Sequence, residues 1–290
     1  MSDISDLRHA PQIVDYVFFD SGTGGLPYML HLKEKSPNTL CIYVADTRNF
    51  PYGLKSGSQI TSCAEAAVRL ILRYFKPRAV VIGCNTISVT ALEQLRASFP
   101  SLHFVGTVPA IKQAASVTKN GRIGLLATRR TVDEPYTAEL ANRFAPDCTL
   151  ITRADPTLIR FIEHDFFTAS EAAKKAAVLP AVDFFAEQGV DTIILGCTHF
   201  LHMADTIAEA AGAGVCVVDS KEGVVNQALR VGLERFEGSV RPVLPPAEPL
   251  YPAYADSTFF ITGPEGINEE PYKILSKKLN IPYGGILKDE

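Results

Sequence analysis

Two cysteines occupy matching positions in the two halves of the chain. The segments AVVIGC (residues 79–84) and TIILGC (residues 192–197) align without a gap at an offset of 113 residues, and they end at Cys84 and Cys197. Each cysteine follows an apolar run and precedes a predicted helix, so we expect its sulfur near helix N-terminal amides, which lower the pKa of a thiol. A thiolate and a thiol on opposite faces of a carbon can act as base and acid, invert that centre, and exchange roles when the direction reverses.

Further polar side chains follow the predicted strands. Ligands of open α/β sheets bind at the carboxyl ends of the strands, so these positions are candidates for a binding site. They comprise Asp20 and Ser21, Asp46 with the segment 50–53, Asn85 and Thr86, Thr128 to Thr131, and Thr198 with His199.

The glycine-rich turn at Gly22, Gly24 and Gly25 admits two interpretations. With Asp46 at the spacing of a ribose-binding acid it resembles a dinucleotide fingerprint, but Pro27 stands at the third glycine position. The simpler interpretation is a tight turn whose backbone N–H groups face a small anion at a helix start.

Cys197 could instead be a metal ligand or a nucleophile. Cys197, His199 and His202 could bind a metal, although no C-x-x-C and no fourth ligand accompany them. A Cys–His nucleophile is also possible, but a hydrolase would not require a second, equivalent cysteine. The remaining cysteines are predicted to be small core residues: Cys41, Cys63, Cys148 and Cys216.

The elements that must position these residues alternate between strands and helices. Short runs rich in Val and Ile end before Asp20, Asp46, Cys84 and Thr107, and the second half repeats the scheme. Helical patterns cover residues 60–75 and 89–99, between the strands. The pattern predicts an α/β protein with two similar doubly wound domains, whose parallel sheets face each other across a central cleft.

The expected organisation has four parts. Residues 1–13 form an N-terminal extension, residues 14–110 the first α/β domain and residues 111–222 the second. Residues 223–290 return to the first domain with an amphipathic helix at 223–236, a Pro-rich connector, a strand at 257–262 and a helix at 272–279.

Composition limits the class of protein. The 290 residues carry 28 basic and 32 acidic side chains, with a net charge of -4, and the isoelectric point is near 5.9. These values argue against a nucleic-acid or anionic-membrane partner. No apolar run approaches the roughly 18 residues of a membrane span, and the start lacks the pattern of a secretory signal. We therefore expect a cytoplasmic protein whose six cysteines are free thiols.

At these residues the sequence resembles the cofactor-independent aspartate/glutamate racemase family, and within it the glutamate racemases. The matching motifs are FDSGTGGL (19–26), ADTRNFPYG (45–53), GCNTIS (83–88), GTVPAIKQAA (106–115), ATRRTV (127–132) and LGCTHF (195–200). They follow the family's order across residues 14–236, with a weaker echo at 257–263.

The resemblance implies roles for individual residues. Cys84 would take the Cα proton of D-glutamate with help from Asp20, and Cys197 would take that of L-glutamate with help from His199 and Glu163. The substrate-binding residues would be Ser21, Pro51, Tyr52, Gly53, Asn85, Thr86, Thr128, Thr131 and Thr198. No cofactor and no metal would be used.

The resemblance also implies a homodimer that supplies D-glutamate for peptidoglycan, and thus for cell wall and cell shape. Two alternatives stay open: a racemase of aspartate or another acidic amino acid, and a non-catalytic regulatory relative of the kind that binds DNA gyrase. Without the resemblance, Asp20 and Ser21 would as readily cap a helix, and Glu163 would be an exposed helix acid.

Four residues depart from the family pattern. Asp155 stands where a cysteine is common, and His164 stands where a small residue is common. Arg129 and Arg130 lie inside the Thr-x-x-Thr segment, where a cation would change the charge felt by the distal carboxylate of the substrate. We expect these departures to leave the reaction intact and to affect kinetic preference or regulation.

Overall fold

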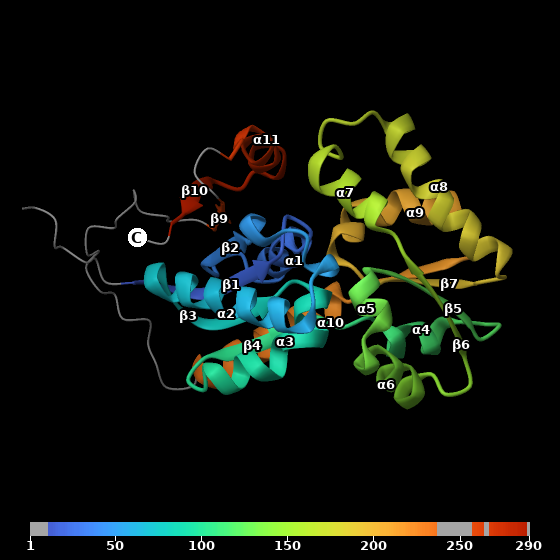
Figure 1. Ribbon diagram of the computed structural model, residues 1–290, viewed down its shortest axis with the longest axis horizontal. Coiled ribbons are helices and arrows are strands. Elements are labelled where there is room, and N and C mark those ends of the chain that lie inside the picture. The colour runs from blue at the N-terminus through green and yellow to red at the C-terminus, as the bar shows by residue number, and fades with distance from the viewer. Residues whose placement is uncertain (1–10, 237–256, 264–266, 289–290) are drawn as a thin grey trace, which may run out of the picture.

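The computed structural model describes residues 11–236, 257–263 and 267–288, and it contains two parallel sheets (Figure 1). The first sheet has the strand order β10-β9-β2-β1-β3-β4 and the second the order β6-β5-β7-β8. Their bounds are β1 Gln12–Asp20, β2 Cys41–Ala45, β3 Phe75–Ile82, β4 His103–Gly106, β5 Arg122–Ala127, β6 Thr149–Ala154, β7 Thr192–Leu195, β8 Cys216–Val218, β9 Thr258–Thr262 and β10 Tyr283–Leu287. The predicted fold class, two parallel α/β domains, is confirmed.

The internal repeat is visible in the strand order. The series β2-β1-β3-β4 and β6-β5-β7-β8 have the same topology, with β1 equivalent to β5 and β3 to β7. The register agrees as well: the Gly83 amide donates to the Phe19 carbonyl at 2.8 Å, and the Gly196 amide donates to the Leu126 carbonyl at 2.7 Å. The two cysteines that follow these glycines therefore leave their sheets at equivalent points.

Helices cover both faces of the sheets, as a doubly wound fold requires (Figure 1). Their bounds are α1 Leu26–Lys35, α2 Gly57–Tyr74, α3 Asn85–Ser98, α4 Ile111–Val117, α5 Arg129–Asp133, α6 Pro135–Phe144, α7 Pro156–His164, α8 Glu171–Glu187, α9 Ala204–Ala211, α10 Lys221–Phe236 and α11 Glu270–Leu279, with 3₁₀ turns η1 Thr47–Asn49, η2 Tyr52–Leu54 and η3 Thr198–Met203.

All four helices with predicted bounds begin earlier than the sequence pattern predicts, and α10 and α11 do so by two residues each. The α2 helix starts at Gly57 rather than 60, because Ser56 and Gln59 form a reciprocal capping box. The α3 helix starts at Asn85 rather than 89, with Cys84 as its N-cap residue. The second difference matters for the site, because it places Cys84 directly at a helix N-terminus.

The last part of the described chain returns to the first sheet. The α10 helix packs against α1, β3 and β4, and β9 and β10 extend the sheet beyond β2. We did not predict β10, whose sequence YGGIL contains two glycines and has low strand propensity. The boundaries at 110 and 222 stay a prediction.

Some predictions fall at or beyond the edge of the described residues. The β1 strand begins at Gln12, so the expected extension over 1–13 overlaps it by two residues, while residues 1–10 and the Pro-rich connector lie outside the described residues. Among the helices that the structure describes, none is long and apolar enough to cross a membrane.

Candidate active site

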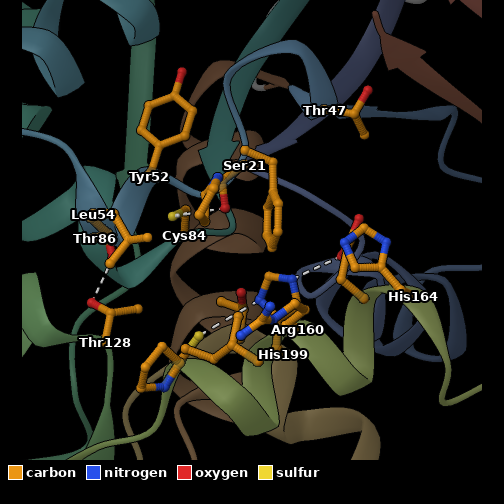
Figure 2. Close-up of a pocket in the computed structure, with 18 of the residues that line it drawn as sticks. Ser21, Thr47, Tyr52, Leu54, Cys84, Thr86, Thr128, Arg160, His164 and His199 are labelled. Carbon is orange, nitrogen blue, oxygen red and sulfur yellow. Dashed lines mark hydrogen bonds and ion pairs between the residues drawn. The ribbon is translucent and has the colours of Figure 1, made fainter. Parts of the chain in front are cut away.

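A cavity of about 760 Å³ lies at the carboxyl ends of the strands and is lined by residues that follow strands of both sheets (Figure 2). Its size is typical of a small-molecule site. Twelve of the predicted site residues line it: Ser21, Pro51, Tyr52, Gly53, Cys84, Asn85, Thr86, Thr128, Glu163, Cys197, Thr198 and His199. Asp20 and Thr131 are buried directly behind this wall.

Cys84 enters the cavity from the first sheet. It is 5% exposed, and its thiol lies 3.8 Å from the Ser21 hydroxyl, to which it can donate. We expected the amides of α3 to lower the pKa of this thiol, and the Ile87 amide does hydrogen-bond the sulfur. However, burial and the nearby Asp20 carboxylate outweigh that bond and raise the pKa of Cys84 well above its usual value, so the prediction is wrong for Cys84.

Asp20 lies behind Cys84 in a fully buried position. One carboxylate oxygen accepts from the Ser21 amide at 2.6 Å, and the other accepts from the Thr198 hydroxyl at 3.0 Å and the Tyr43 hydroxyl at 3.3 Å. Burial raises the pKa of the Asp20 carboxyl, and His199 together with hydrogen bonds from Ser21, Thr198 and Cys84 offsets the rise only in part. Asp20 is therefore more basic than an exposed aspartate and better suited to take a proton.

Cys197 enters the cavity from the second sheet, at the start of η3. Its sulfur lies 3.6 Å from Nδ1 of His199, whose Nε2 lies 2.8 Å from the Glu163 carboxylate. Because a carboxylate only accepts, Nε2 carries a hydrogen, and a second proton is shared between Nδ1 and the sulfur. Burial alone would lower the pKa of His199, but Cys197 and Glu163 together raise it well above its usual range. His199 can therefore hold the proton of Cys197.

Glu163 comes from the α7 helix, which is capped by Asp155 and starts with Pro156. Its Oε2 accepts three hydrogen bonds: from the Thr23 amide at 2.9 Å, the Thr23 hydroxyl at 2.7 Å and His199 at 2.8 Å. Burial would raise the pKa of this carboxyl, but the bonds from His199 and Thr23 lower it overall. Glu163 therefore stays ionised, although it is buried, and keeps His199 basic.

The glycine-rich turn is closed by the opposite domain. A Cβ on Gly22 would lie 2.7 Å from the Glu163 carboxylate, and one on Gly24 would lie 2.6 Å from the His199 amide nitrogen. The glycines therefore permit a close approach of the two domains, which leaves no space for a dinucleotide. The anion that we expected at this turn is the carboxylate of Glu163, bound by the Thr23 amide.

The opposite wall of the cavity offers polar groups to a ligand. Both side-chain polar atoms of Asn85 are buried and have no hydrogen-bond partner. The Thr86 hydroxyl at the start of α3 lies 2.9 Å from the Thr128 hydroxyl (Figure 2), which in turn lies 3.0 Å from the Thr131 hydroxyl on α5. Since buried amide groups are normally satisfied, Asn85 is poised to bind a polar ligand.

The loop between β2 and α2 forms a further part of the wall. Pro51, Tyr52 and Gly53 line the cavity, and a Cβ on Gly53 would lie 2.9 Å from Cβ of Thr128. The Tyr52 hydroxyl donates to Asp46 at 2.5 Å. Asp46 thus fixes this loop and does not bind a ribose.

The departures from the family pattern have different surroundings. Asp155 caps α7 by accepting from the Leu158 amide at 3.0 Å, and it does not line the cavity. Arg130 pairs with Glu134 at 2.7 Å. Arg129 and His164 both line the cavity, so both can affect the charge that a ligand meets.

Sequence reasoning missed Arg160 and Thr23. Arg160 lies on α7 one turn before His164, and both line the cavity (Figure 2). Among the lining residues that the structure describes, Glu163 is the only acid, so the cavity is more positive than the acidic chain as a whole. The i,i+4 spacing of Arg160 and His164 could have revealed this face, whereas nothing in the sequence pairs Thr23 with Glu163.

The remaining cysteines differ from one another. Cys41 is buried, as predicted, and Cys63 and Cys148 are half-buried. Cys216 is exposed at the start of β8, so the prediction that it fills the core is wrong. Within the described residues, no group of three or more His, Cys, Asp or Glu side chains is arranged to hold a metal ion.

Comparison with known proteins gives a consistent result. The model of the Asp/Glu/hydantoin racemase family matches residues 30–228. The chain is 44% identical over 228 residues to a glutamate racemase of Treponema pallidum, covering 79% of this chain and 84% of that protein. It is 36% identical over 223 residues to a glutamate racemase of Proteus mirabilis, covering 76% and 77%.

A solved structure extends the similarity to nearly the whole fold. The Escherichia coli glutamate racemase, crystallised with L-glutamate and the activator UDP-MurNAc-Ala, superposes with a TM-score of 0.78 at 29% identity. The match covers 96% of this chain and 98% of that one.

Proposed function

The chain belongs to the Asp/Glu/hydantoin racemase family, and on that premise we propose that it is a glutamate racemase that uses two cysteines as acid and base. The observation that carries the proposal is that Cys84 and Cys197 line one cavity from equivalent points of the two sheets. Each also has its own partner for a proton, Asp20 for Cys84 and His199 with Glu163 for Cys197.

The reaction from L-glutamate starts at Cys197. His199 takes the thiol proton on Nδ1, and the Glu163 carboxylate stabilises the imidazolium that forms. The thiolate then removes the Cα proton, and the electron pair left on Cα is delocalised into the α-carboxylate. The Cys84 thiol, whose pKa is high, delivers its proton to the opposite face and yields D-glutamate.

The reaction from D-glutamate uses the same groups in reversed roles. Cys84 must first lose its proton, and Asp20 is the base beside it whose pKa burial raises. The α-ammonium group of the substrate supplies a positive charge that stabilises the thiolate in a buried site. Cys84 then removes the Cα proton, and Cys197 protonates the opposite face.

We propose that the substrate is bound by the Asn85 amide, which has no hydrogen-bond partner, and by hydroxyl groups that line the cavity. We assign the carboxylates of glutamate to the Asn85 amide and to the hydroxyls of Thr86 and Thr128, because neutral donors of this kind bind anions without needing a counter-charge. Donors that face the α-carboxylate also stabilise the charge that develops there during proton removal. We expect Ser21, Pro51, Tyr52, Gly53 and Thr198 to shape the site, and Thr131 to act through Thr128.

The biological setting is also a proposal. Glutamate racemases supply D-glutamate for peptidoglycan, so we assign this chain to cell-wall biogenesis in the cytoplasm. We further propose a homodimer, on the resemblance to the family alone.

The substrate can be tested by following circular dichroism during incubation with L-glutamate, D-glutamate, L-aspartate and D-aspartate separately. We expect the signal of both glutamate enantiomers to decay to zero, with no cofactor added, and aspartate to react far more slowly. Faster racemisation of aspartate would assign the chain to the aspartate branch. Absence of both racemisation and Cα deuterium exchange would show a non-catalytic relative.

A further inference from the structure

His202 is a second histidine near the site for which the mechanism has no role. It lies on η3, three residues after His199, and its ring is 5.8 Å from the ring of Phe166 and 5.3 Å from that of Phe167. The sequence offered it as a metal ligand. In the structure its Nε2 lies 3.1 Å from the backbone carbonyl oxygen of Thr23 instead.

This contact fixes the tautomer of His202. A carbonyl oxygen only accepts hydrogen bonds, so Nε2 must carry a hydrogen and donate it to Thr23. Burial lowers the pKa of His202 to about 4, with His199 and Lys221 also lowering it, and Thr23 and Glu163 opposing them. His202 is therefore a neutral donor at physiological pH, and its role does not depend on its titration.

Thr23 is the residue that holds Glu163. Its amide and its hydroxyl both donate to Oε2 of Glu163, at 2.9 and 2.7 Å. Thr23 also stands between Gly22 and Gly24, and glycines leave the backbone of a turn more freedom than other residues do. The Thr23 carbonyl, one peptide unit after the amide that binds Glu163, accepts from the Leu26 amide at 3.2 Å and from His202 at 3.1 Å. His202 therefore holds the backbone of Thr23 from outside the turn.

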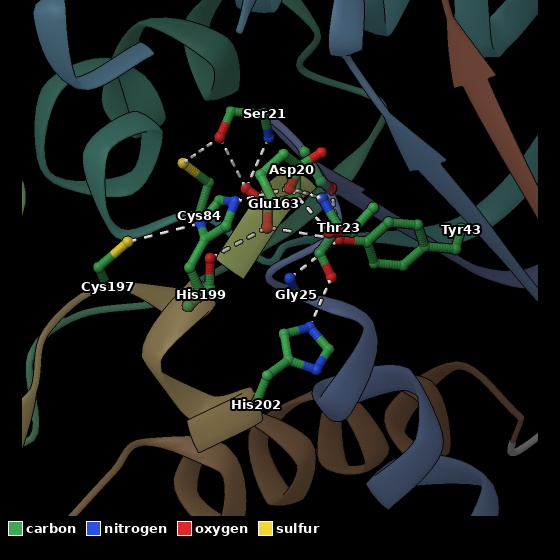
Figure 3. Close-up of polar contacts among 12 residues, drawn as sticks. Asp20, Ser21, Thr23, Gly25, Tyr43, Cys84, Glu163, Cys197, His199 and His202 are labelled. Atoms are coloured by element: carbon green, nitrogen blue, oxygen red, sulfur yellow. Dashed lines mark hydrogen bonds and ion pairs between the residues drawn. The ribbon is translucent and has the colours of Figure 1, made fainter. Parts of the chain in front are cut away.

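We infer that His202 is a positioning residue of the Cys197 half of the site, which acts through Thr23 and Glu163 on His199. Figure 3 shows the series of contacts from His202 to Thr23, Glu163, His199 and Cys197. The inference rests on the proposed function, because only that function gives Cys197, the last residue of this series, a catalytic role. It predicts that His202 affects the chemistry of one cysteine and not that of the other.

The steady-state rates alone cannot separate the two cysteines. Enantiomers have equal free energy, so kcat/KM must be the same in both directions whatever the variant. Variants with a single cysteine separate the two halves in deuterated water. In Cys84→Ala, Cys197 can remove the Cα proton of L-glutamate, exchange it for solvent deuterium, and return the deuteron to the same face without inversion. In Cys197→Ala, Cys84 does the same with D-glutamate.

The experiment adds His202→Leu or His202→Gln to each single-cysteine variant. We expect His202→Leu to slow L-glutamate exchange in Cys84→Ala about fivefold, the change that corresponds to the loss of one neutral hydrogen bond. D-glutamate exchange in Cys197→Ala should stay within twofold. His202→Gln, whose amide can donate from the same place, should recover most of the rate. Thermal unfolding of each variant verifies that it is folded.

Each outcome decides the inference. Selective slowing by His202→Leu with recovery by His202→Gln supports it. Equal slowing of both exchange reactions shows a merely structural role and overturns it, and so does the absence of any slowing. If His202→Leu does not fold, the exchange rates are compared for His202→Gln and His202→Asn instead. Equal rates for these two substitutions in both single-cysteine variants overturn the inference. If the single-cysteine variants exchange no enantiomer, or the same one, the proposed function itself fails, and the inference fails with it.

Discussion

Replacement of Glu163 by glutamine tests how the protein makes Cys197 a base. The amide has nearly the same shape as the carboxylate and keeps an oxygen for the Thr23 donors, but it removes the negative charge beside His199. Since Glu163 is one of the groups that raise the pKa of His199, the pKa must fall in the variant. His199 then holds the proton of Cys197 less well, and less thiolate forms.

The size of the expected decrease in kcat follows from one contact, the hydrogen bond from His199 to Glu163, which changes from a charged to a neutral acceptor. Nε2 of His199 lies 2.8 Å from Glu163 Oε2, and both side chains are buried, with exposed fractions of 2% and 1%. A hydrogen bond to a charged group contributes about 1.5–3 kcal/mol and a neutral one about 1 kcal/mol. The difference of about 1–2 kcal/mol predicts a kcat that is lower by roughly 5- to 30-fold.

The assay is racemisation of L-glutamate followed by circular dichroism across the pH range. We expect kcat to fall by that factor, KM to change little, and the acid limb of the profile to move to lower pH. Glu171→Gln, an exposed substitution on α8 with a side chain that is 77% accessible, is the matched control and should leave the profile unchanged. An unaltered kcat and acid limb in Glu163→Gln would refute the assignment of Glu163 to His199.

Three further predictions concern binding and stability. Asn85→Ala should raise KM for glutamate by roughly 10- to 100-fold, as expected for a lost hydrogen bond to a carboxylate, without lowering the melting temperature, because the amide has no partner in the free protein. Arg160→Gln should raise KM severalfold at low salt and less at high salt, with kcat unchanged, whereas Lys175→Gln, which lies outside the cavity, should change neither. His202 has a folded pKa of about 4 against an unfolded value of about 6.5, so it binds more protons when unfolded, and its contribution is lost as pH falls from 6.5 towards 4. Urea unfolding at pH 7 and pH 5 should therefore show a loss about 2 kcal/mol larger for the wild type than for His202→Gln.

The sequence was most informative where chemistry follows a strand. Apolar runs of Val and Ile predicted the strand that ends at Asp20 and the strands that end two residues before Cys84 and Cys197, and the topology confirms that the two halves are equivalent. This succeeded because a buried parallel strand needs a continuous apolar run, and its end is marked by the first polar residue. The motifs then selected the family, which periodicity alone could not do.

The residue pattern alone could not predict which side chains act as partners of the cysteines. Glu163 occurs in an amphipathic helix, where an acid is ordinarily exposed, and its burial depends on donors from Thr23 that lie 140 positions away. The same holds for the pKa of Cys84, because burial and the Asp20 carboxylate, which both raise it, act on the thiol only in the folded protein. The exposure of Cys216 and the strand β10 were missed for a similar reason, since both depend on which sheet edge the chain reaches.

The most direct test of the account is Cα deuterium exchange in Cys84→Ala and Cys197→Ala, measured by proton NMR together with chiral chromatography of the recovered glutamate. We expect neither variant to racemise glutamate at an appreciable rate, and we expect the double variant not to exchange the Cα proton. Cys84→Ala should exchange only L-glutamate and Cys197→Ala only D-glutamate, each with retention of configuration. Racemisation by either variant at the wild-type rate, or exchange of the same enantiomer by both, would contradict it.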